Sequence, residues 1–503
     1  MRRALTSAQM DRACGVLLAA ACGDALGAGY EFGSAELDGP PGMIGGGLGG
    51  FDPGEWTDDT AQAVAIAEVA ATGVDLRSEE GLTSIARRFA DWYADGPPDV
   101  GIQTSQVLSL AGRRPSGRGM QAAAVAVHRR TGRSAGNGSL MRTGVVALAH
   151  LVDPETLVEA AMAVSALTHH EDMAQEGCAL WCLAIRHAVL TGELPTAGDL
   201  LPSMPHPERW AEILEEAEQR EPREFSQNGW VVGALQAAWS AIVHTAVPDD
   251  VPCRHLPDAL GTAIAIGHDT DTVAAIAGAL LGARWGASAV PAEWRRILHG
   301  WPGRRAQELV ELAALTVHAG RPDRGGWPGI ERMEHVLDPG FGTCVPHPHD
   351  DGVWIGGMGA LDDLPGGVDA VVTLCRYGSR QVPPGLEHVA FRLIDTDDGD
   401  NPNLDFVIDD AARTVARLRD EGRTVLLHCV AAHSRTPTVA ARYAVLRGRP
   451  PDLALRDVVA ALPNARPNPS FLRALDRLAD RTSRRESRAA AAPAVEGSGP
   501  CRD

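Results

Sequence analysis

Apolar residues recur at intervals of three and four over most of the first 320 positions of this 503-residue chain. That spacing places apolar side chains on one face of an α-helix. Segments with this pattern are 16–27, 61–71, 121–130, 144–152, 155–167, 174–190, 231–243, 272–286 and 306–319. No convincing strand pattern interrupts them, so we predict an all-α domain over residues 8–320.

The pattern changes after Gly320. Residues 321–345 are rich in Gly, Pro and His, which predicts a linker. Short β-like runs at 352–357, 369–374, 388–394 and 424–429 then alternate with helical runs at 403–422, 436–448, 453–462 and 470–480. This alternation predicts a smaller α/β domain with a central sheet over residues 346–480. Residues 481–503 have few large apolar side chains, which predicts a disordered tail.

The composition of the chain limits which partners it can bind and in which cellular compartment we expect it. The net charge of -19 argues against broad nucleic-acid binding and against binding to anionic membranes. The nine cysteines show no CxxC pairs, so neither a disulfide framework nor a zinc site is expected. We find no clean signal peptide and no segment that we judge long and apolar enough to span a bilayer. These features predict a soluble, cytoplasmic protein.

Two short acidic motifs stand directly before apolar helices: TDDT at residues 57–60 and DTDT at residues 269–272. Helix capping explains one Thr or Asp at each start, because such residues satisfy the first N–H groups. Capping does not require two acids and two threonines at both helices. If the motifs lie together, their carboxylates repel, and a divalent cation would relieve that repulsion. Asp and Thr oxygens suit Mg2+ or Mn2+.

Small residues recur at every fourth position on two predicted helices, as Gly15, Ala19, Gly23 and Gly27 on one and Gly278, Gly282 and Gly286 on the other. Such smooth faces allow close packing, which could bring the acidic ends of the two helices together. Asp24 and Glu31 follow at the end of the first helix. For Asp24, a hydrogen bond at a helix terminus is favoured over contact with a metal.

A glycine-rich loop, GNGSLMR at residues 136–142, precedes Thr168 and His169. Exposed backbone N–H groups in such a loop can hold a phosphate. An ordinary turn has the same composition, and a single His after an apolar helix is more often structural than functional. The loop therefore adds to the acidic motifs without deciding the function by itself.

Taken together, five motifs resemble those of the ADP-ribosylglycohydrolase family over about residues 10–300. They are GDALG with Glu31, WTDDT, GNGSLMR, LTHH and HDTDTVAAIAGALLGA. The family includes the dinitrogenase reductase-activating glycohydrolases. The resemblance implies an all-helical fold, a centre of two Mg2+ or Mn2+ ions, and cleavage of ADP-ribose from a protein or small-molecule substrate. The positions that match its metal ligands are Thr57, Asp58, Asp59, Asp269, Asp271 and Thr272.

The same resemblance implies roles for the remaining motif residues. Glu31 matches an acidic residue implicated in catalysis at the ribose. The positions that match the ADP-ribose pocket are Gly136, Asn137, Gly138, Ser139, Arg142 and His169. His268 stands where the family usually has Gly, and Leu140 replaces a small residue, so both could reshape the pocket. The alternative is an ADP-ribose-binding protein without catalysis, against which the retention of Glu31 and all six ligands argues.

Residues 424–437, TVLLHCVAAHSRTP, predict a buried strand, a tight loop and a helix. Cys429 stands at the strand end and Arg435 at the helix start. The N–H groups at a helix start suit a phosphate dianion, and the same field favours a thiolate. Arg435 could hold two phosphate oxygens, and Ser434 could assist the departure of the thiolate.

This segment resembles the protein tyrosine and dual-specificity phosphatases, whose signature is HC, five residues, then R and Ser or Thr. Over about residues 345–478, the resemblance implies that Cys429 is the nucleophile and Arg435 binds phosphate. The general acid would come from Asp395, Asp397 or Asp398, which the sequence does not separate from one another or from a solvated acidic turn; Asp397 is our working assignment.

One position departs from the phosphatase pattern. Ala432 stands where that family usually has Gly, and its side chain could crowd the phosphate or strain the loop. An active phosphatase and a domain that only binds a phosphorylated group therefore both stay open. A third possibility is a phosphatase that the N-terminal domain regulates.

Overall fold

The computed structural model describes residues 5–335, 338–397 and 399–491, and within them the chain forms two compact units. The first comprises Met1–Met333 with the short segments Arg376–Val382 and Asp400–Asn403, and the second comprises the remaining residues. The first unit thus extends into the segment predicted as a linker. The reason is Trp327, which is buried against Met10, Cys14 and Ala314. An indole that packs in this way holds the segment to the helices.

The first unit is helical, apart from the two-residue strands β1 (His299–Gly300) and β2 (Arg304–Arg305) among its described residues. Its α-helices are α1 (Ser7–Gly27), α2 (Asp58–Ala70), α3 (Glu79–Ala94), α4 (Ile102–Ala111), α5 (Gly117–Thr131), α6 (Leu140–Thr143), α7 (Val146–Ala149), α8 (Pro154–Ser165), α9 (Asp172–Thr191), α10 (Ala197–Leu200), α11 (Pro207–Gln219), α12 (Val231–His244), α13 (His255–Ile264), α14 (Thr270–Trp285), α15 (Ala292–Ile297) and α16 (Ala306–Val317). The prediction of a helical domain is confirmed.

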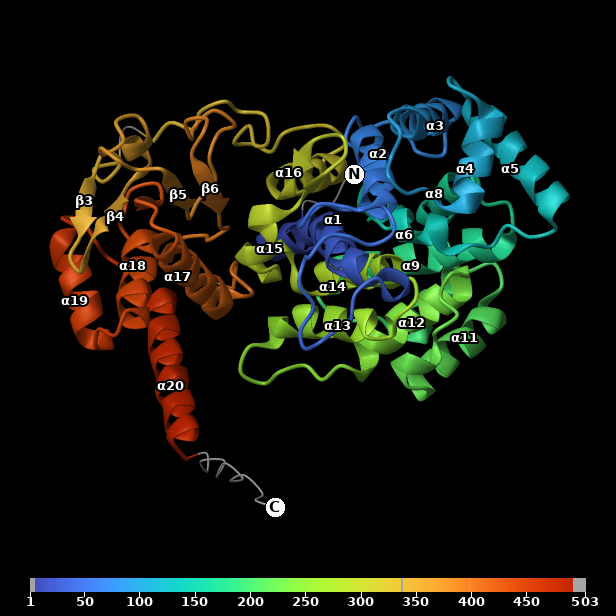
Figure 1. Ribbon diagram of the computed structural model, residues 1–503. Coiled ribbons are helices and arrows are strands. Elements are labelled where there is room, and N and C mark those ends of the chain that lie inside the picture. The colour runs from blue at the N-terminus through green and yellow to red at the C-terminus, as the bar shows by residue number, and fades with distance from the viewer. Residues whose placement is uncertain (1–4, 336–337, 398, 492–503) are drawn as a thin grey trace, which may run out of the picture. The chain divides into compact units, whose positions relative to one another are not determined.

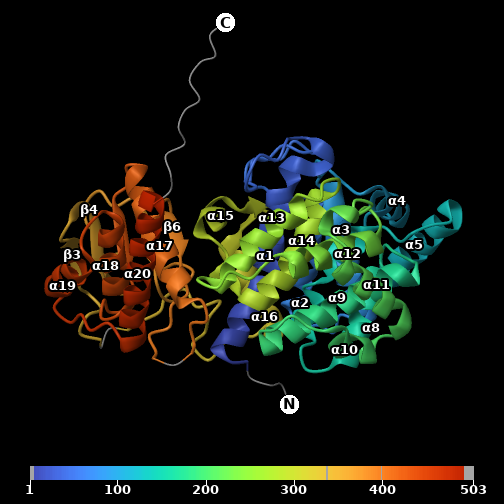
Figure 2. The ribbon, with the colours of Figure 1, turned by 90° about the horizontal axis from the view of Figure 1, so that it is seen from below.

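Helices α1 and α14 pack side by side in the middle of this unit (Figures 1 and 2). Their small residues make this approach possible, because Gly23 and Gly278 each lie against the backbone of the opposite helix. A Cβ atom on Gly27 would lie 2.5 Å from the Cα of Asp271, which is too close for any side chain. The glycine faces therefore bring the end of α1 to the acidic start of α14, as the four-residue spacing predicted.

The expectation that no segment is long and apolar enough to span a membrane is wrong on length and composition. The helical segment Ser7–Gly33 has a mean hydropathy of 1.4 over its most apolar window. That window is entirely buried inside the structure. Its apolar character follows from its central position, since α1 contacts α14, α16 and α9 on different sides.

The second unit contains a five-stranded sheet in the order β3-β4-β7-β5-β6. The strands are β3 (Cys344–His347), β4 (Asp350–Gly356), β5 (Ala370–Thr373), β6 (Glu387–Ala390) and β7 (Val425–His428). Only β3 runs antiparallel to its neighbour, β4. The helices are α17 (Leu404–Asp420), α18 (Arg435–Leu446), α19 (Pro451–Ala461) and α20 (Pro469–Ala491). A smaller unit with a sheet is thus present, with β7 central and leading directly into the loop before α18.

Three elements of the second unit differ from the prediction. Strand β3 lies partly within the predicted linker, and β6 ends at Ala390, earlier than the apolar run suggested. Helix α20 continues past Arg481 to Ala491, within the segment predicted to be disordered. Arg and Ala dominate there and have high helix propensity, so low hydrophobicity alone misled the prediction. The rest of that segment, 492–503, lies outside the described residues.

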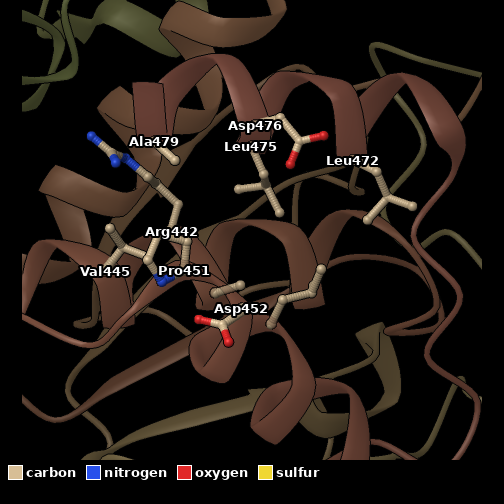
Figure 3. A pocket seen from close by; sticks show the side chains of 10 residues that line it. Arg442, Val445, Pro451, Asp452, Leu472, Leu475, Asp476 and Ala479 are labelled. Carbon is tan, nitrogen blue, oxygen red and sulfur yellow. The ribbon is translucent and has the colours of Figure 1, made fainter. Parts of the chain in front are cut away.

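A cavity of about 400 Å³ lies among α18, α19 and α20 (Figure 3). Its lining combines apolar side chains, such as Leu472 and Leu475 of α20, with the carboxylates of Asp452 and Asp476. None of the residues that the sequence analysis singled out lines this cavity. The candidate sites lie elsewhere, at the starts of α2, α14 and α18.

Candidate functional site

The starts of α2 and α14 meet in the structure. The Thr272 hydroxyl, in the first turn of α14, donates to the Asp59 carboxylate in the first turn of α2 at 3.3 Å. The Thr57 hydroxyl donates to the same carboxylate oxygen at 3.3 Å and accepts the backbone N–H of Asp59. One contact thus joins motifs that are more than two hundred residues apart in sequence.

Glu31 joins this cluster from the segment after α1. Oxygen atoms of Glu31, Asp269 and Asp271 lie within 4.8 Å of one another, a separation that allows all three to hold one cation. The backbone fixes this arrangement, because the Phe32 N–H donates to the His268 carbonyl at 2.7 Å. His268 has a φ of 62°, a left-handed conformation that favours glycine. This explains structurally why a Gly suits that position.

The electrostatics of the cluster favour a cation. Burial raises the pKa of Asp59 and of Asp271 well above the ordinary carboxyl value, and neighbouring carboxylates raise both further. Burial, and next the charge of Asp269, raises the pKa of Glu31 to about 8. One oxygen each of Asp59 and Asp271 is buried without a hydrogen-bond partner among the described residues. Such orphaned oxygens in an oxygen-only donor set fit a hard divalent cation such as Mg2+ or Mn2+.

Asp24 has a structural role. Its carboxylate accepts the backbone N–H groups of Thr57 at 3.0 Å and of Thr60 at 2.9 Å. It therefore caps the start of α2 from a different helix, in agreement with the hydrogen-bond interpretation favoured from sequence. By fixing this helix start, Asp24 positions the motif that carries Asp59.

Asp58 lies beside an acid that the sequence analysis missed. Its carboxylate accepts a hydrogen bond from the Gln62 side chain at 3.1 Å. Burial raises the pKa of Asp58 well above its ordinary value, and the charge of Asp99 is the next cause. The charge of Asp99 also contributes to the raised pKa of Glu31. Asp99 follows a Pro-Pro turn without any recognisable motif, so only the fold places it near the cluster.

The glycine-rich loop reaches the acids through Asn137. Its side-chain amide donates to the Asp269 carboxylate and to the Asn228 carbonyl, both at 2.8 Å. Asn228, which the sequence analysis also missed, accepts the backbone N–H of Asp269 at 3.2 Å. Gly136 pairs with Trp230, a residue that is 49% exposed. The loop thus combines a fixed amide, two half-buried glycines and a neighbouring exposed aromatic residue.

The remaining residues predicted for the ADP-ribose pocket lie beneath this loop. Arg142 is fully buried, donates to Gln62 and Thr168, and lies over the Phe89 ring. Ser139 and His169 are also buried, and each is hydrogen bonded. In the structure these three side chains support the loop, in which Asn137 is also buried and Gly136 and Gly138 are half-buried. Their assignment to the ADP-ribose pocket stays a prediction. Burial lowers the pKa of Arg142 to about 10.

In the second unit, the loop from Cys429 to Arg435 joins β7 to α18. Within the part of the chain that the structure describes, the backbone N–H groups of residues 430–434 donate to no other group. The Nε of Arg435 is buried without a hydrogen-bond partner there, while its Nη1 donates to the Leu393 carbonyl at 3.1 Å. Ala432 has a φ of 55°, a left-handed conformation that favours glycine. Free N–H groups beside a guanidinium form a site for an anion.

The structure separates two of the three acids proposed from sequence. Asp395 accepts from the Asn468 side chain at 2.9 Å, and its other oxygen lies 3.9 Å from Arg435 Nε. Asp397 instead forms an exposed ion pair with Arg473 at 2.8 Å. Asp398 lies outside the described residues. The Ser434 hydroxyl accepts the backbone N–H of Asn468 at 3.0 Å. Of the two described candidates, Asp395 thus contacts a residue of the loop, whereas Asp397, the working assignment, pairs with Arg473.

Comparison with known proteins gives matches for both parts of the chain. A relative from Pseudomonas putida (strain GB-1), ADP-ribosylarginine hydrolase Tri1, is 29% identical over 314 residues, which cover 60% of this chain and 79% of the relative. The ADP-ribosyl-[dinitrogen reductase] glycohydrolase of Rhodospirillum rubrum is 28% identical, covering 56% and 89% respectively. 

Among solved structures, an ADP-ribosylglycohydrolase-related protein complex is similar at 27% identity, with a TM-score of 0.46, and covers 62% of this chain and 99% of that structure. Human DUSP28 is similar at 21% identity, with a TM-score of 0.24, and covers 27% and 95% respectively. The model of the ADP-ribosylglycohydrolase family matches residues 5–324, the region that carries the acidic cluster. The chain therefore belongs to the ADP-ribosylglycohydrolase family.

Proposed function

We propose that the first unit hydrolyses the glycosidic bond between ADP-ribose and a protein or small-molecule acceptor, with two Mg2+ or Mn2+ ions as cofactors. The observation that carries this proposal is the convergence of Asp59, Thr272, Glu31 and Asp271 at two helix starts. Thr57, Asp58 and Asp269 complete the proposed ligand set. The orphaned oxygens of Asp59 and Asp271 support it, because buried carboxylates without partners are costly.

Each group has a role in this reaction. When bound, the divalent cations would supply Lewis-acid polarisation and lower the pKa of a water. Glu31 is the proposed general acid or base at the scissile bond. Positive charge develops at the anomeric carbon during cleavage, and the surrounding carboxylates stabilise it. Asn137 holds Asp269 in place, which keeps the acids oriented toward the ribose.

The glycine-rich loop is the proposed site for the rest of ADP-ribose. Its backbone N–H groups would hold a phosphate, and the exposed Trp230 indole would stack on the adenine. Two relatives are named for their action on ADP-ribosylarginine and on ADP-ribosylated dinitrogen reductase. These names support an ADP-ribosylated protein as the substrate of this chain.

A panel of defined substrates tests this function. Proteins ADP-ribosylated on Arg or on Ser, and a small-molecule ADP-ribose conjugate, would be incubated with the full chain in Mg2+, in Mn2+ and in chelator. Release of ADP-ribose that depends on the cation is expected for at least one linkage. Binding of ADP-ribose without release from any substrate would instead favour the alternative of a non-catalytic ADP-ribose-binding protein.

We further propose that the second unit has the fold of a dual-specificity phosphatase and hydrolyses a phosphorylated group. Two features favour this function: the N–H groups of residues 430–434 donate to no other group in the described part of the chain, and the Nε of the half-buried Arg435 has no hydrogen-bond partner there. Cys429 is the proposed nucleophile, Ser434 the residue that assists thiolate departure, and Asp395, rather than Asp397, the general acid.

Turnover of an aryl phosphate tests the second activity. Para-nitrophenyl phosphate would be assayed with the wild-type chain and with Cys429→Ser and Asp395→Asn. Loss in Cys429→Ser, with at least a tenfold decrease in Asp395→Asn, is expected. An equal loss in Asp397→Asn would return the acid role to that residue. Retained phosphate binding without turnover would identify a domain that only binds a phosphorylated group.

A further inference from the structure

A short chain of hydrogen bonds links three strands of the second unit to the Cys429 loop. Strand β5 lies between β6 and β7, and Thr373 is aligned with His428 across the β5–β7 pair. The Thr373 hydroxyl lies 2.8 Å from Nε2 of His428 and 2.9 Å from Nε2 of His388 on β6. Nδ1 of His428 lies 3.2 Å from the carbonyl oxygen of Cys429.

The direction of each hydrogen bond follows from the chemistry of these groups. A carbonyl oxygen only accepts, so His428 Nδ1 carries a proton and donates to Cys429. Burial lowers the pKa of His428 to about 3 and of His388 to about 4, so both rings are neutral at physiological pH. His428 Nε2 is then a lone pair that accepts from Thr373. The Thr373 oxygen in turn accepts from the Nε2–H of His388.

We propose that Thr373 and His388 are positioning residues that hold the Cys429 loop in its anion-binding conformation. The inference rests on the proposed phosphatase or phosphate-binding function of the second unit. Thr373 donates to His428 and holds its ring in place, and His428 then fixes the orientation of the Cys429 carbonyl. His388 fixes the direction in which the Thr373 hydroxyl points.

The importance of this orientation lies in the neighbouring backbone. The N–H groups of residues 430–434 donate to no group among residues 5–335, 338–397 and 399–491, so they can bind an anion or stabilise a thiolate. Without the Thr373 hydroxyl, His428 Nε2 would be a buried acceptor without this donor, and the ring would lose the contact that holds its orientation. A ring that turns away would no longer aim its Nδ1–H at the Cys429 carbonyl. The peptide at the start of the loop would then rotate, and its N–H groups would no longer converge.

The test measures the loop without requiring catalysis. Alkylation of Cys429 by iodoacetamide would be followed across pH by peptide mass spectrometry on the full chain, with and without inorganic phosphate. We expect Thr373→Val to slow alkylation at pH 7 by roughly three- to tenfold, because less thiolate is present, and to weaken protection by phosphate similarly. Thr373→Ser retains the hydroxyl and should stay within about twofold of wild type. His388→Leu should have a smaller effect in the same direction.

A matched control separates this role from a general effect on folding. Thr414 is also a buried threonine of the second unit, but its hydroxyl donates to the Asp410 carbonyl within α17. Thr414→Val should therefore leave the alkylation profile of Cys429 unchanged. Circular dichroism and thermal unfolding would establish that each variant is folded.

Either of two results would overturn the inference. One is a Cys429 alkylation profile that is unchanged in Thr373→Val. The other is alkylation that is slowed as much in Thr373→Ser as in Thr373→Val. If Thr373→Val does not fold, an unchanged profile in His388→Leu has the same consequence. The proposed function fails separately: a wild-type chain that neither turns over an aryl phosphate nor gains protection from phosphate contradicts it. Altered alkylation in Thr373→Val would still support the positioning role in that case.

Discussion

The two units place their candidate sites at the same structural feature, the start of an α-helix, but with opposite charge. At α2 and α14, buried carboxylates converge, and two of their oxygens have no partner among the described residues. At α18, free N–H groups stand beside the Arg435 guanidinium. The first arrangement suits a cation and the second suits an anion. The helix start alone therefore does not determine the ligand; the side chains around it do.

The largest effect is expected from removing a carboxylate of the first site. Asp271→Ala should lower release of ADP-ribose at least about a hundredfold, because both the cation site and its orientation are lost. The measurement is the initial rate on an ADP-ribosylated protein at saturating Mg2+. Asp258→Asn, at an exposed position of α13, is the control and should keep full activity. Nearly full activity in Asp271→Ala would contradict the contrast between a cation site in the first unit and an anion site in the second, since the acids would then not form a cation site.

A smaller effect is expected at the edge of the glycine-rich loop. Trp230→Ala should raise KM for the ADP-ribosylated substrate about tenfold with little change in kcat, because stacking on a base is lost in the ground and transition states alike. Trp230→Phe should restore most of the affinity because it keeps an aromatic face. A change confined to kcat would show that the indole acts on the reacting centre instead.

Removal of the cation should make the stability of the first unit depend on pH. The pKa of Glu31 rises from about 4.5 unfolded to about 8 folded. Its stabilising contribution is therefore complete below about pH 4.5 and is lost as the pH rises through about 8. In chelator, Tm should fall by several degrees from pH 5 to pH 8.5.

Added Mg2+ or Mn2+ should restore Tm most strongly at the upper end of this range, since the carboxylates bind it when deprotonated. Glu31→Gln should flatten the curve obtained in chelator. Identical curves with and without cation would contradict the assignment of a cation site. The second unit offers the opposite test, because inorganic phosphate should stabilise it without any divalent cation.

The smallest effects concern two residues that share a backbone conformation. His268 and Ala432 both have a positive φ beside a candidate site, one in each unit. His268→Gly and Ala432→Gly should each stabilise the chain by up to about 1 kcal/mol, because the strain exceeds the entropic cost of glycine. Urea unfolding measures the difference.

The exposed helical position Ala122, in α5, provides the control for this pair. Ala122→Gly should destabilise the chain by about 1 kcal/mol, the opposite sign. If all three substitutions destabilise equally, the left-handed positions store no strain. A gain in aryl phosphate turnover in Ala432→Gly would further indicate that the methyl group crowds the anion.

Local patterns in the sequence were sufficient to predict several features of this protein. The four-residue spacing of glycines predicted the close packing of α1 and α14. The two acidic motifs predicted that the starts of α2 and α14 converge. The strand, loop and helix around Cys429 were also predicted, because each depends on neighbours along the chain. Such features follow from backbone geometry and from hydrophobic periodicity.

Only the tertiary structure decided which side chains face the sites. It buried Arg142 beneath the glycine-rich loop and brought Asp99 and Asn228 to the acids. It directed Asp397 toward Arg473 and Asp395 toward Arg435. Residues two positions apart in a loop have the same local pattern, so contacts with distant elements determine where each points. The physical reason is that burial and long-range hydrogen bonds depend on the packed fold, which no local spacing encodes.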